Sequence, residues 1–227
     1  IALNPINVYY LTNTWPLMTK FRSDLPAFAT FARVPGRPSF LVTGGAEVFN
    51  FANGERELPE MITWTGAANW QDYVNATPEQ MKVEPTPSRG RGWQPLATSA
   101  PTEREKAWLA AQAKYGSQAP AGPAWGLAKA LKDSGMDKGR IAVDDMRIAY
   151  LLQNIGMDQI TFVPGEQVFR KIRVVKTEPE LELMRIAGRN NAEAAMATAR
   201  SITSGMTYDE VEHRFLVECA LRGNEVM

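Results

Sequence analysis

The sequence holds one cysteine, Cys219, and one histidine, His213, among its 227 residues. A single cysteine cannot form an internal disulfide, which fits a reducing compartment. A single histidine argues against the usual zinc sites and against most Ser-His-Asp or Cys-His catalytic systems. His213 falls off the apolar positions of its segment, so a solvated helix face explains it. Cys219 falls on those positions and is predicted to be a small core residue.

The sequence also lacks net charge and long apolar runs. Its 25 Lys and Arg residues balance 25 Asp and Glu residues, so no strong field steers it onto nucleic acid or an anionic membrane. The run Arg89–Trp93 is a weak RNA-binding signal, and an ordinary loop explains it. No apolar run approaches the ~20 residues needed to span a bilayer. The given sequence opens at Ile1 and shows no signal-peptide pattern. We expect no nucleic-acid or membrane partner, a cytoplasmic location, and further residues upstream of Ile1.

What is present favours a mixed α/β fold with a sizeable core, since apolar residues make up 44% of the chain. A turn at Pro35–Pro38 predicts a hairpin between two β-rich runs. A strand at 140–143, a helix at 146–155 and a strand at 160–163 form a predicted βαβ unit. Val8–Leu11 fits either a strand or a helical turn. Further β-rich runs are residues 1–3, 27–32, 39–42 and 61–64. A short helix is expected at 46–52.

The stretch 84–101 is rich in proline and glycine and predicts a surface loop, inserted into the first domain. Thr102 is predicted to cap a helix, because Glu103 and Glu105 suit the positive N-terminal end of a helix. A further helix is expected at 125–132.

The last fifty residues predict two helices. Thr177 with Glu180, and Thr207 with Glu210, are capping-box pairs. The first helix runs for about seven turns at 3.6 residues per turn. Its apolar stripe, rich in small residues, suggests close packing against a flat partner, expected downstream of Met227 or from another chain. That stripe consists of Leu181, Met184, Ala187, Gly188, Ala192, Ala195, Ala199 and Ile202.

Three segments resemble creatinase/prolidase-type metallohydrolases. Asn4–Thr12 is similar to the "NPxNVxYLTG" segment of the family's N-terminal domain, with Asn13 in place of the usual glycine. Ile172–Ala187 resembles the linker and first helix of the pita-bread catalytic domain, and Ser204–Val211 resembles the turn into its second helix. The resemblance implies a mixed sheet flanked by helices over residues 1–172. It also implies the start of an incomplete pita-bread domain over 173–227.

The resemblance carries expectations about activity. In the family, two aspartates, one histidine and two glutamates hold a pair of divalent metal ions that activate water. All five fall beyond Met227, so the two ions are expected in the complete parent protein. We expect no catalytic and no metal-ligating residue here, and no activity of this chain alone. The parent is expected to be a homodimeric metallopeptidase of the Xaa-Pro dipeptidase or aminopeptidase P type, acting on X-proline peptides or small amides.

This chain would then supply dimerisation contacts and one wall of the active-site entrance. Phe21 and Arg22 are the substrate-binding candidates, in a segment that resembles the element reaching a neighbouring subunit's site. Two alternatives stay open for the function. One is a non-catalytic binding or scaffold module of the same fold, and the other is a creatinase-like amidinohydrolase or lyase relative.

Two further readings concern acidic and aromatic residues. Asp144 and Asp145 follow a predicted strand, where α/β proteins keep their sites, but an acid before a helix is also an ordinary N-cap, and we favour capping. Glutamates at 178, 180 and 182 are explained by the start of their helix. Trp15, like Phe21 and Arg22, either marks a contact surface or packs under its loop, and the sequence leaves both readings open.

Overall fold

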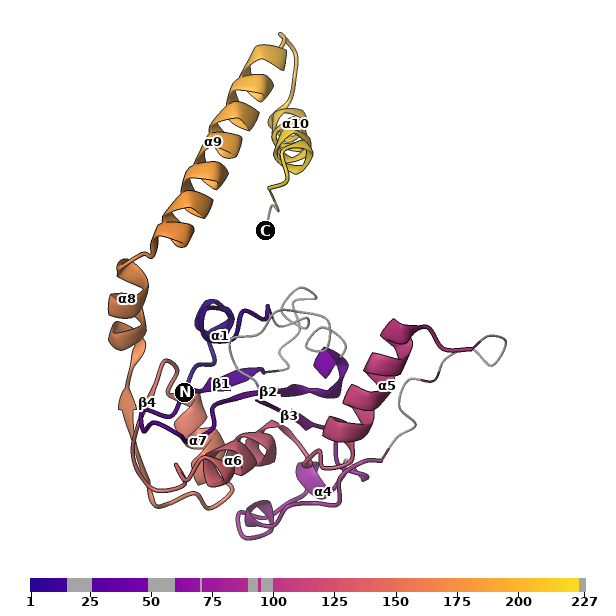
Figure 1. The fold of residues 1–227 in the computed structure, drawn as a ribbon, viewed down its shortest axis with the longest axis vertical. Helices are drawn as coiled ribbons and strands as arrows, with labels where there is room; N and C mark the ends of the chain where they lie inside the picture. Colours follow the sequence, from indigo (N-terminus) through magenta and orange to yellow (C-terminus); the bar gives the residue numbers. More distant parts are fainter. Residues whose placement is uncertain (16–25, 49–59, 70, 90–93, 95–99, 225–227) are drawn as a thin grey trace. The chain divides into compact units, whose positions relative to one another are not determined.

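The computed structural model describes residues 1–15, 26–48, 60–69, 71–89, 94 and 100–224 (Figure 1). The chain divides into two compact units, Ile1–Arg170 and Lys171–Met227, and each is described by itself. This division lies close to the expected domain boundary at 172/173, which itself stays a prediction. None of the described helices combines the length and apolar character that a membrane crossing needs.

The first unit is built on two small sheets. β1 (Phe28–Thr30), β2 (Phe40–Gly44) and β3 (Glu60–Trp64) lie in that order, with β1 antiparallel and β3 parallel to β2. The predicted hairpin between β1 and β2 is confirmed, and Gly36 in its turn has a positive φ of 82° that favours glycine. β4 (Gly139–Val143) and β5 (Ile160–Pro164) are parallel and connected by α7 (Arg147–Gln153), as the predicted βαβ unit requires.

The first residues of the chain connect the two sheets. Ala2 exchanges two backbone hydrogen bonds with Ala29 of β1, at 2.8 and 2.9 Å. On the other side, the Ile1 nitrogen donates to the Ala142 carbonyl at 2.7 Å, and the Asp144 N–H donates to the Ile1 carbonyl at 3.3 Å. Residues 1–3 therefore lie between β1 and β4, as Figure 1 shows near the label N.

Alternation along the strands gives the larger sheet two apolar faces, because successive side chains point to opposite sides. One face packs on α6 (Pro123–Asp133) and α7, and the other packs under α1 (Pro5–Thr12) and α5 (Glu103–Gly116) (Figure 1). The first face presents Phe28, Phe40, Val42, Ile62 and Trp64. The second presents Ala29, Leu41 and Met61. The predicted mixed α/β fold with flanking helices is present in this unit.

Helix α6 approaches the sheet closely at Gly126. A side-chain carbon built there would lie 3.2 Å from both Trp64 Cβ and Val42 Cγ1. The helix begins at Pro123, whose fixed φ suits the first helical position. The absence of a side chain at Gly126 is what lets α6 lie this near to β2 and β3.

Helix α1 resolves the ambiguity at residues 8–11 in favour of a helix. Asn4 is its N-cap, with Oδ1 accepting a 3.0 Å hydrogen bond from the Ile6 N–H, and Pro5 follows at the first helical position. Of the predicted helix over 46–52, the described residues show the 3-10 turn η1 (Gly45–Glu47) and a helical residue at Val48, and residues 49–52 lie outside the described residues.

Helix α8 (Glu166–Val174) was not predicted. It starts directly after β5, where the Gly165 N–H donates to the Val143 carbonyl at 2.6 Å. A side-chain carbon on Gly165 would lie 3.1 and 3.2 Å from backbone atoms of Val143, so glycine allows this close return to β4. The first unit also contains α4 (Gln71–Val74) and the 3-10 turn η2 (Gln80–Lys82).

The second unit contains a helical hairpin of α9 (Glu178–Ser201) and α10 (Tyr208–Leu221). Both predicted capping boxes are formed. The helix cap predicted at Thr102 of the first unit is also present, as a capping box with Glu105. Cys219 is buried, as predicted, and His213 is exposed. The Asn190 side chain ties the two helices together by donating to the Arg222 carbonyl at 2.8 Å.

The face of α9 that α10 covers is not the predicted apolar stripe. The buried positions of α9 are Ala194 and Thr198, whereas Met184 and Ile202 of the stripe are 57% and 51% exposed. Helix α10 therefore packs on the neighbouring face of α9, which is lined by small and polar side chains.

Candidate functional site at the end of helix α1

The two predicted substrate-binding residues, Phe21 and Arg22, lie outside the described residues. What is described is the base from which their segment starts, namely α1 and residues 13–15. We treat α1 and residues 13–15 as the candidate site, because a rigid base is needed to position the side chains of the segment that follows it.

The end of α1 is closed by several local contacts. Asn13 adopts a left-handed conformation with φ of 51°, which asparagine tolerates better than most residues. The Thr12 hydroxyl is buried and donates to the Val8 carbonyl at 2.8 Å, while it accepts from the Thr14 N–H at 3.1 Å. The chain therefore leaves the helix at a defined angle, although the usual glycine is missing.

Trp15 packs on the helix that precedes it. Its ring lies edge-on to the ring of Tyr9, with centroids 5.7 Å apart and an angle of 69° between the planes. Such an edge-to-face pair is favourable by about 0.5–1.5 kcal/mol beyond the area it buries. Of the two readings left open for Trp15, the structure favours packing.

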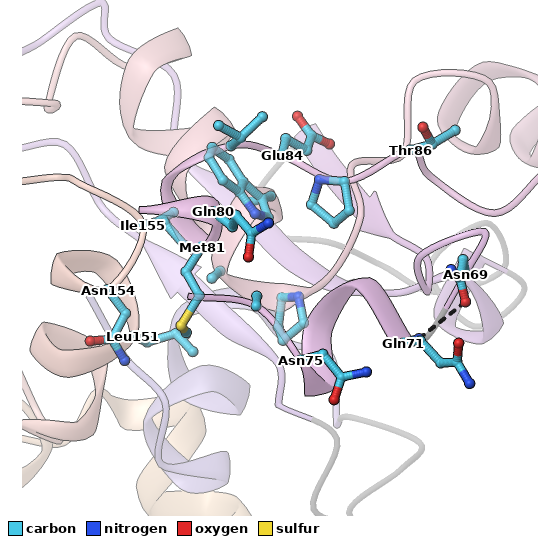
Figure 2. Close-up of a pocket in the computed structure, with 16 residues that line it drawn as sticks. Asn69, Gln71, Asn75, Gln80, Met81, Glu84, Thr86, Leu151, Asn154 and Ile155 are labelled. Atoms are coloured by element: carbon cyan, nitrogen blue, oxygen red, sulfur yellow. Dashed lines mark hydrogen bonds between the residues drawn. The ribbon is translucent and has the colours of Figure 1, made fainter. Parts of the chain in front are cut away.

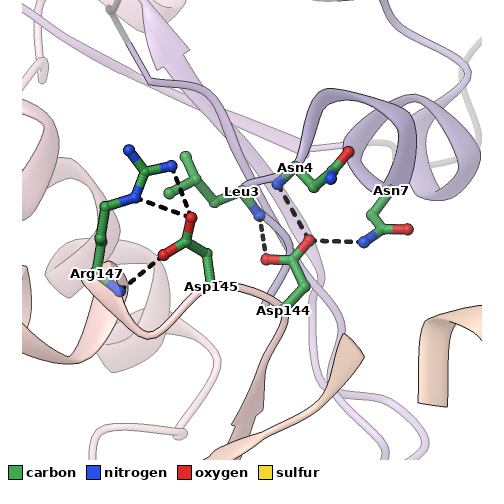
Figure 3. A network of polar contacts seen from close by, with 6 residues as sticks. All are labelled: Leu3, Asn4, Asn7, Asp144, Asp145 and Arg147. Carbon is green, nitrogen blue, oxygen red and sulfur yellow. Dashed lines mark hydrogen bonds and ion pairs between the residues drawn. The ribbon is translucent and has the colours of Figure 1, made fainter. Parts of the chain in front are cut away.

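The start of α1 is held by Asp144, which follows β4 (Figure 3). One oxygen of Asp144 accepts from the Leu3 N–H at 2.8 Å. The other accepts from the Asn4 N–H at 3.1 Å and from the Asn7 side-chain amide at 2.8 Å. The sequence predicted that Asp144 caps the helix after it, and for this residue the prediction is wrong. Asp144 instead satisfies backbone donors about 140 residues earlier in the chain.

Asp145, its neighbour, does serve the helix that follows. Its Oδ1 accepts from the Arg147 N–H at 2.8 Å, and its Oδ2 pairs with the Arg147 guanidinium at 2.7 and 2.9 Å (Figure 3). The side-chain hydrogen bond from Arg147 holds the pKa of Asp145 below its ordinary value. The two adjacent aspartates thus have separate roles, one in joining distant segments and one in starting α7.

Asn7 is the residue that sequence reasoning passed over. It is fully buried, and its amide nitrogen also donates to Glu166 Oε2 at 3.2 Å, while Glu166 pairs with Arg170 at 3.1 Å. Its Oδ1 is buried without a hydrogen-bond partner among the described residues. Asn7 stands inside the quoted "NPxN" segment, but nothing in the sequence marks its partners at positions 144 and 166.

A second buried polar group lies in the same layer. Glu47 is only 1% exposed and precedes Val48, which packs in the apolar cluster with Val8 of α1. A buried carboxylate is costly unless it is paired, so such a residue is a marker of a specific local arrangement. No periodicity or motif distinguishes Glu47 from the surface acids of the chain.

The arrangement at α1 is suited to positioning. Asp144 accepts three hydrogen bonds and Asp145 is paired with a guanidinium, so both carboxylates are occupied by structural partners. Within the described ranges, no group of three or more His, Cys, Asp and Glu side chains could hold a metal ion. What the described part of the site provides is a fixed exit for the segment after Trp15.

Among known proteins, the chain is similar in fold to a solved structure. Neither a protein-family model nor a curated protein matches the chain. The fold is similar to that of a prolidase from Pyrococcus furiosus, with a TM-score of 0.51 and 15% sequence identity. The match covers 97% of this chain and 44% of the prolidase chain, so this chain spans less than half of that protein's length. At this identity the likeness concerns the fold alone, and it establishes that the chain has a prolidase-like α/β fold.

Proposed function

We propose that this chain is the N-terminal, non-catalytic part of a metal-dependent hydrolase that acts on X-proline peptides or related small amides. In this proposal the chain contributes dimerisation contacts and one wall of the entrance to the active site. The observation that carries it is the fold likeness to prolidase, because that likeness extends over 97% of the chain and so includes both compact units.

The anchoring of α1 supports the proposed wall. Asp144, Asn7 and the buried Thr12 fix both ends of α1, and the segment with Phe21 and Arg22 follows directly. A guanidinium suits a substrate carboxylate, because its planar fork can donate two parallel hydrogen bonds. A phenyl ring beside it suits the apolar part of a small substrate.

The open face of the second unit supports a further partner for its helices. Met184 and Met196 of α9, Ile202 directly after α9, and Leu221 of α10 are all more than half exposed. Isolated apolar side chains at a surface are normal, but several on one helical hairpin mark a surface that another structure covers. The proposal assigns this cover to a catalytic domain beyond residue 227 or to a second subunit.

The metal pair of such hydrolases does not fit the described residues, which offer no group of ligands for it. We therefore derive no chemical step of this chain through a metal. In the proposal, the metal ligands belong to sequence beyond Met227.

The test is to compare this 227-residue chain with the product of any longer reading frame that contains it. The longer protein should hydrolyse X-proline dipeptides in the presence of Mn²⁺ or Co²⁺, and the 227-residue chain should not. Calorimetric titration of the short chain with the same ions should show no stoichiometric site with a Kd below about 1 µM, a level equivalent to about −8 kcal/mol of binding.

Two outcomes would count against the proposal. Dipeptide hydrolysis by the short chain would refute its non-catalytic role. A longer reading frame without an ordered series of two Asp, one His and two Glu, and without dipeptidase activity, would instead favour a binding or scaffold module of the same fold.

A further inference from the structure

The first unit contains a pocket of about 880 Å³ that the proposed function does not use (Figure 2). Its walls come from α4, from the segment around η2, from the first turn of α6 and from the end of α7. Pockets that bind small molecules typically measure about 300–1,000 Å³, so this one can hold a ligand of two or three rings.

The pocket walls are held in place by specific hydrogen bonds. The Thr77 N–H donates to Gln80 Oε1 at 2.8 Å, and the Gln80 N–H returns a bond to the Thr77 hydroxyl at 3.3 Å. This reciprocal pair has the logic of a capping box and orders the start of η2. The Glu84 carboxylate accepts from the Ala121 N–H at 2.9 Å and so ties the 83–86 segment to the chain just before α6.

The polar lining consists mainly of carboxamides. These are Asn69, Gln71, Asn75, Gln80 and Asn154. They come from three separate parts of the chain, and Figure 2 shows them distributed around the pocket. A carboxamide both donates and accepts hydrogen bonds, so such a lining matches ligand groups that also do both.

Charge is nearly absent from the lining. No lysine, arginine or histidine is among the described residues that line the pocket, and its one carboxylate, Glu84, already accepts a backbone hydrogen bond. Phosphates and carboxylates are recognised by cations and by clustered N–H donors, so this lining does not suit an anionic ligand. The chemistry selects an uncharged molecule.

The rest of the lining is apolar. Val83 is 69% exposed and Met81 is 37% exposed, and both face the pocket together with Trp125, Leu151 and Ile155. Apolar side chains left open beside polar ones suit a ligand that has an apolar face and a polar rim. A pyranose ring has this form, with C–H groups on its faces and hydroxyls at its edge.

We propose that this pocket is a binding site for an uncharged saccharide of one to three rings. Each hydroxyl of such a ligand both donates and accepts, which is the property shared by the carboxamides. The apolar wall around Trp125 and Leu151 contacts the ring faces. A neutral peptide is the competing class, but its hydrogen-bonding groups alternate along a chain, whereas the carboxamides surround a compact space.

The experiment is saturation-transfer NMR on the whole 227-residue chain, with maltose, cellobiose and chitobiose as probes. Inorganic phosphate and the tripeptide Gly-Pro-Gly, acetylated at its N-terminus and amidated at its C-terminus so that it is uncharged, serve as comparison ligands. We expect at least one disaccharide to bind with a Kd near 1 mM, equivalent to about −4 kcal/mol, and phosphate not to displace it.

Two variants locate the binding. Asn154→Ala removes one carboxamide and should weaken disaccharide binding about fivefold, as expected for one lost hydrogen bond. Ala124→Trp fills the pocket from the first turn of α6 and should abolish binding. Gln153→Ala is the matched control, since Gln153 adjoins Asn154 on the chain but does not line the pocket. Circular dichroism confirms that each variant is folded.

Three results would overturn the proposal. The first is that none of the three disaccharides binds when its concentration is about tenfold above the expected Kd. The second is that binding survives in a folded Ala124→Trp variant, because the site then lies elsewhere. The third is displacement of the disaccharide by Gly-Pro-Gly at lower concentration, which would assign the pocket to neutral peptides.

Discussion

The amide nitrogen of Asn7 lies 2.8 Å from Asp144 Oδ2 and 3.2 Å from Glu166 Oε2, so one neutral side chain separates two carboxylates. Asn7 is fully buried, and the two acids follow β4 and β5 of the βαβ unit. An amide donor is suited to this place because it satisfies both acids without adding charge.

The substitution Asn7→Asp should therefore destabilise the first unit by about 3 kcal/mol at pH 7, since it replaces a shared donor with a third carboxylate. Repulsion and burial raise the pKa of the new carboxyl above the unfolded value of about 3.9. The defect should accordingly be smallest below that value and grow as the pH rises through the folded pKa. Urea unfolding followed by tryptophan fluorescence reports on this unit, because all six tryptophans lie between positions 15 and 125.

Asn7→Ala is the control for this prediction. It removes both hydrogen bonds and adds no charge, so its defect should change little between pH 4 and 7. If Asn7→Asp and Asn7→Ala lose the same stability at every pH, the two carboxylates do not interact with position 7 as described.

Thr177→Ala should open the first turn of α9. The hydrogen bond from the Thr177 N–H, followed by the one from its hydroxyl, holds the pKa of Glu180 below its ordinary value of 4.5. Because the folded pKa is depressed, this support for the helix start is present above the unfolded pKa and is lost as the pH falls through the folded value. Carboxyl-detected NMR titration should show the pKa of Glu180 moving up in the variant.

The second capping box supplies an internal reference for that titration. Glu210 is held in the same way by Thr207, and its pKa is lowered for the same reason. The Thr177→Ala substitution should leave Glu210 unchanged, and Thr207→Ala should give the mirror result. Equal movement of both carboxyls in one variant would indicate unfolding of the hairpin and not loss of a cap.

Replacing a helical glycine with valine should have a large effect on stability at Gly126 and almost none at Gly188. Gly126→Val should cost about 2–3 kcal/mol, because its new atoms would meet Trp64 and Val42 at the tight contact of α6 with the sheet. Gly188→Val should change stability by less than about 0.5 kcal/mol, since open space surrounds that position and the two residues differ little in helix propensity. Urea unfolding serves for the first variant, and far-ultraviolet circular dichroism for the second. A large loss at Gly188 would mean that the stripe containing it is covered in solution.

Arg22→Ala tests the proposed wall of the active-site entrance in the longer parent protein. We expect the KM for an X-proline dipeptide to rise about fivefold, the loss of one charged hydrogen bond at a solvated site, with stability changed by no more than ~1 kcal/mol. Arg22→Lys should recover only part of the affinity, because an ammonium cannot form the two parallel bonds. Arg33→Ala, at an exposed position of the first unit, is the matched control. An unaltered KM on every accepted substrate would remove Arg22 from the proposed site.

Hydrogen exchange tests the open face of the helical hairpin. Amides in residues 178–222 should exchange faster than those in 140–163 when the chain is monomeric, because few buried apolar contacts hold the hairpin. Sedimentation velocity on the same sample establishes whether the chain is a monomer. Strong protection of 178–222 in a proven monomer would contradict the proposal that another structure covers this face.

The features that sequence reasoning recovered are encoded over short distances. The two predicted capping boxes each need two residues three positions apart. The hairpin at Gly36 and the βαβ unit each follow from propensity and turn chemistry within about thirty residues. The assignment of residues 8–11 failed to decide between helix and strand because four apolar residues fit both periods. Asn4 as N-cap and Pro5 as first helical residue are the local signals that favour a helix there.

The features it missed depend on pairs far apart in the chain. Asp144 resembles a helix cap locally, and only the fold brings Leu3 and Asn7 to it. Helix α8 was missed because no local pattern marks residues 165–171 as helical, although Gly165 allows the helix to start by its close approach to β4. The pocket was missed for the same reason, since its carboxamides converge from positions 69 to 154 and no local pattern relates them.

The position of residues 1–3 between the two sheets has a consequence for the order of folding during synthesis. Their hydrogen-bond partners in and after β4 lie 141 residues later in the chain. At about 5–20 residues per second, a ribosome needs roughly 7–30 s to make that interval. Through that time the side of residues 1–3 that later bonds with β4 stays unpaired, which is the kind of strand edge that recruits other chains. The nascent protein therefore depends on residues 1–3 staying available until residue 144 has emerged.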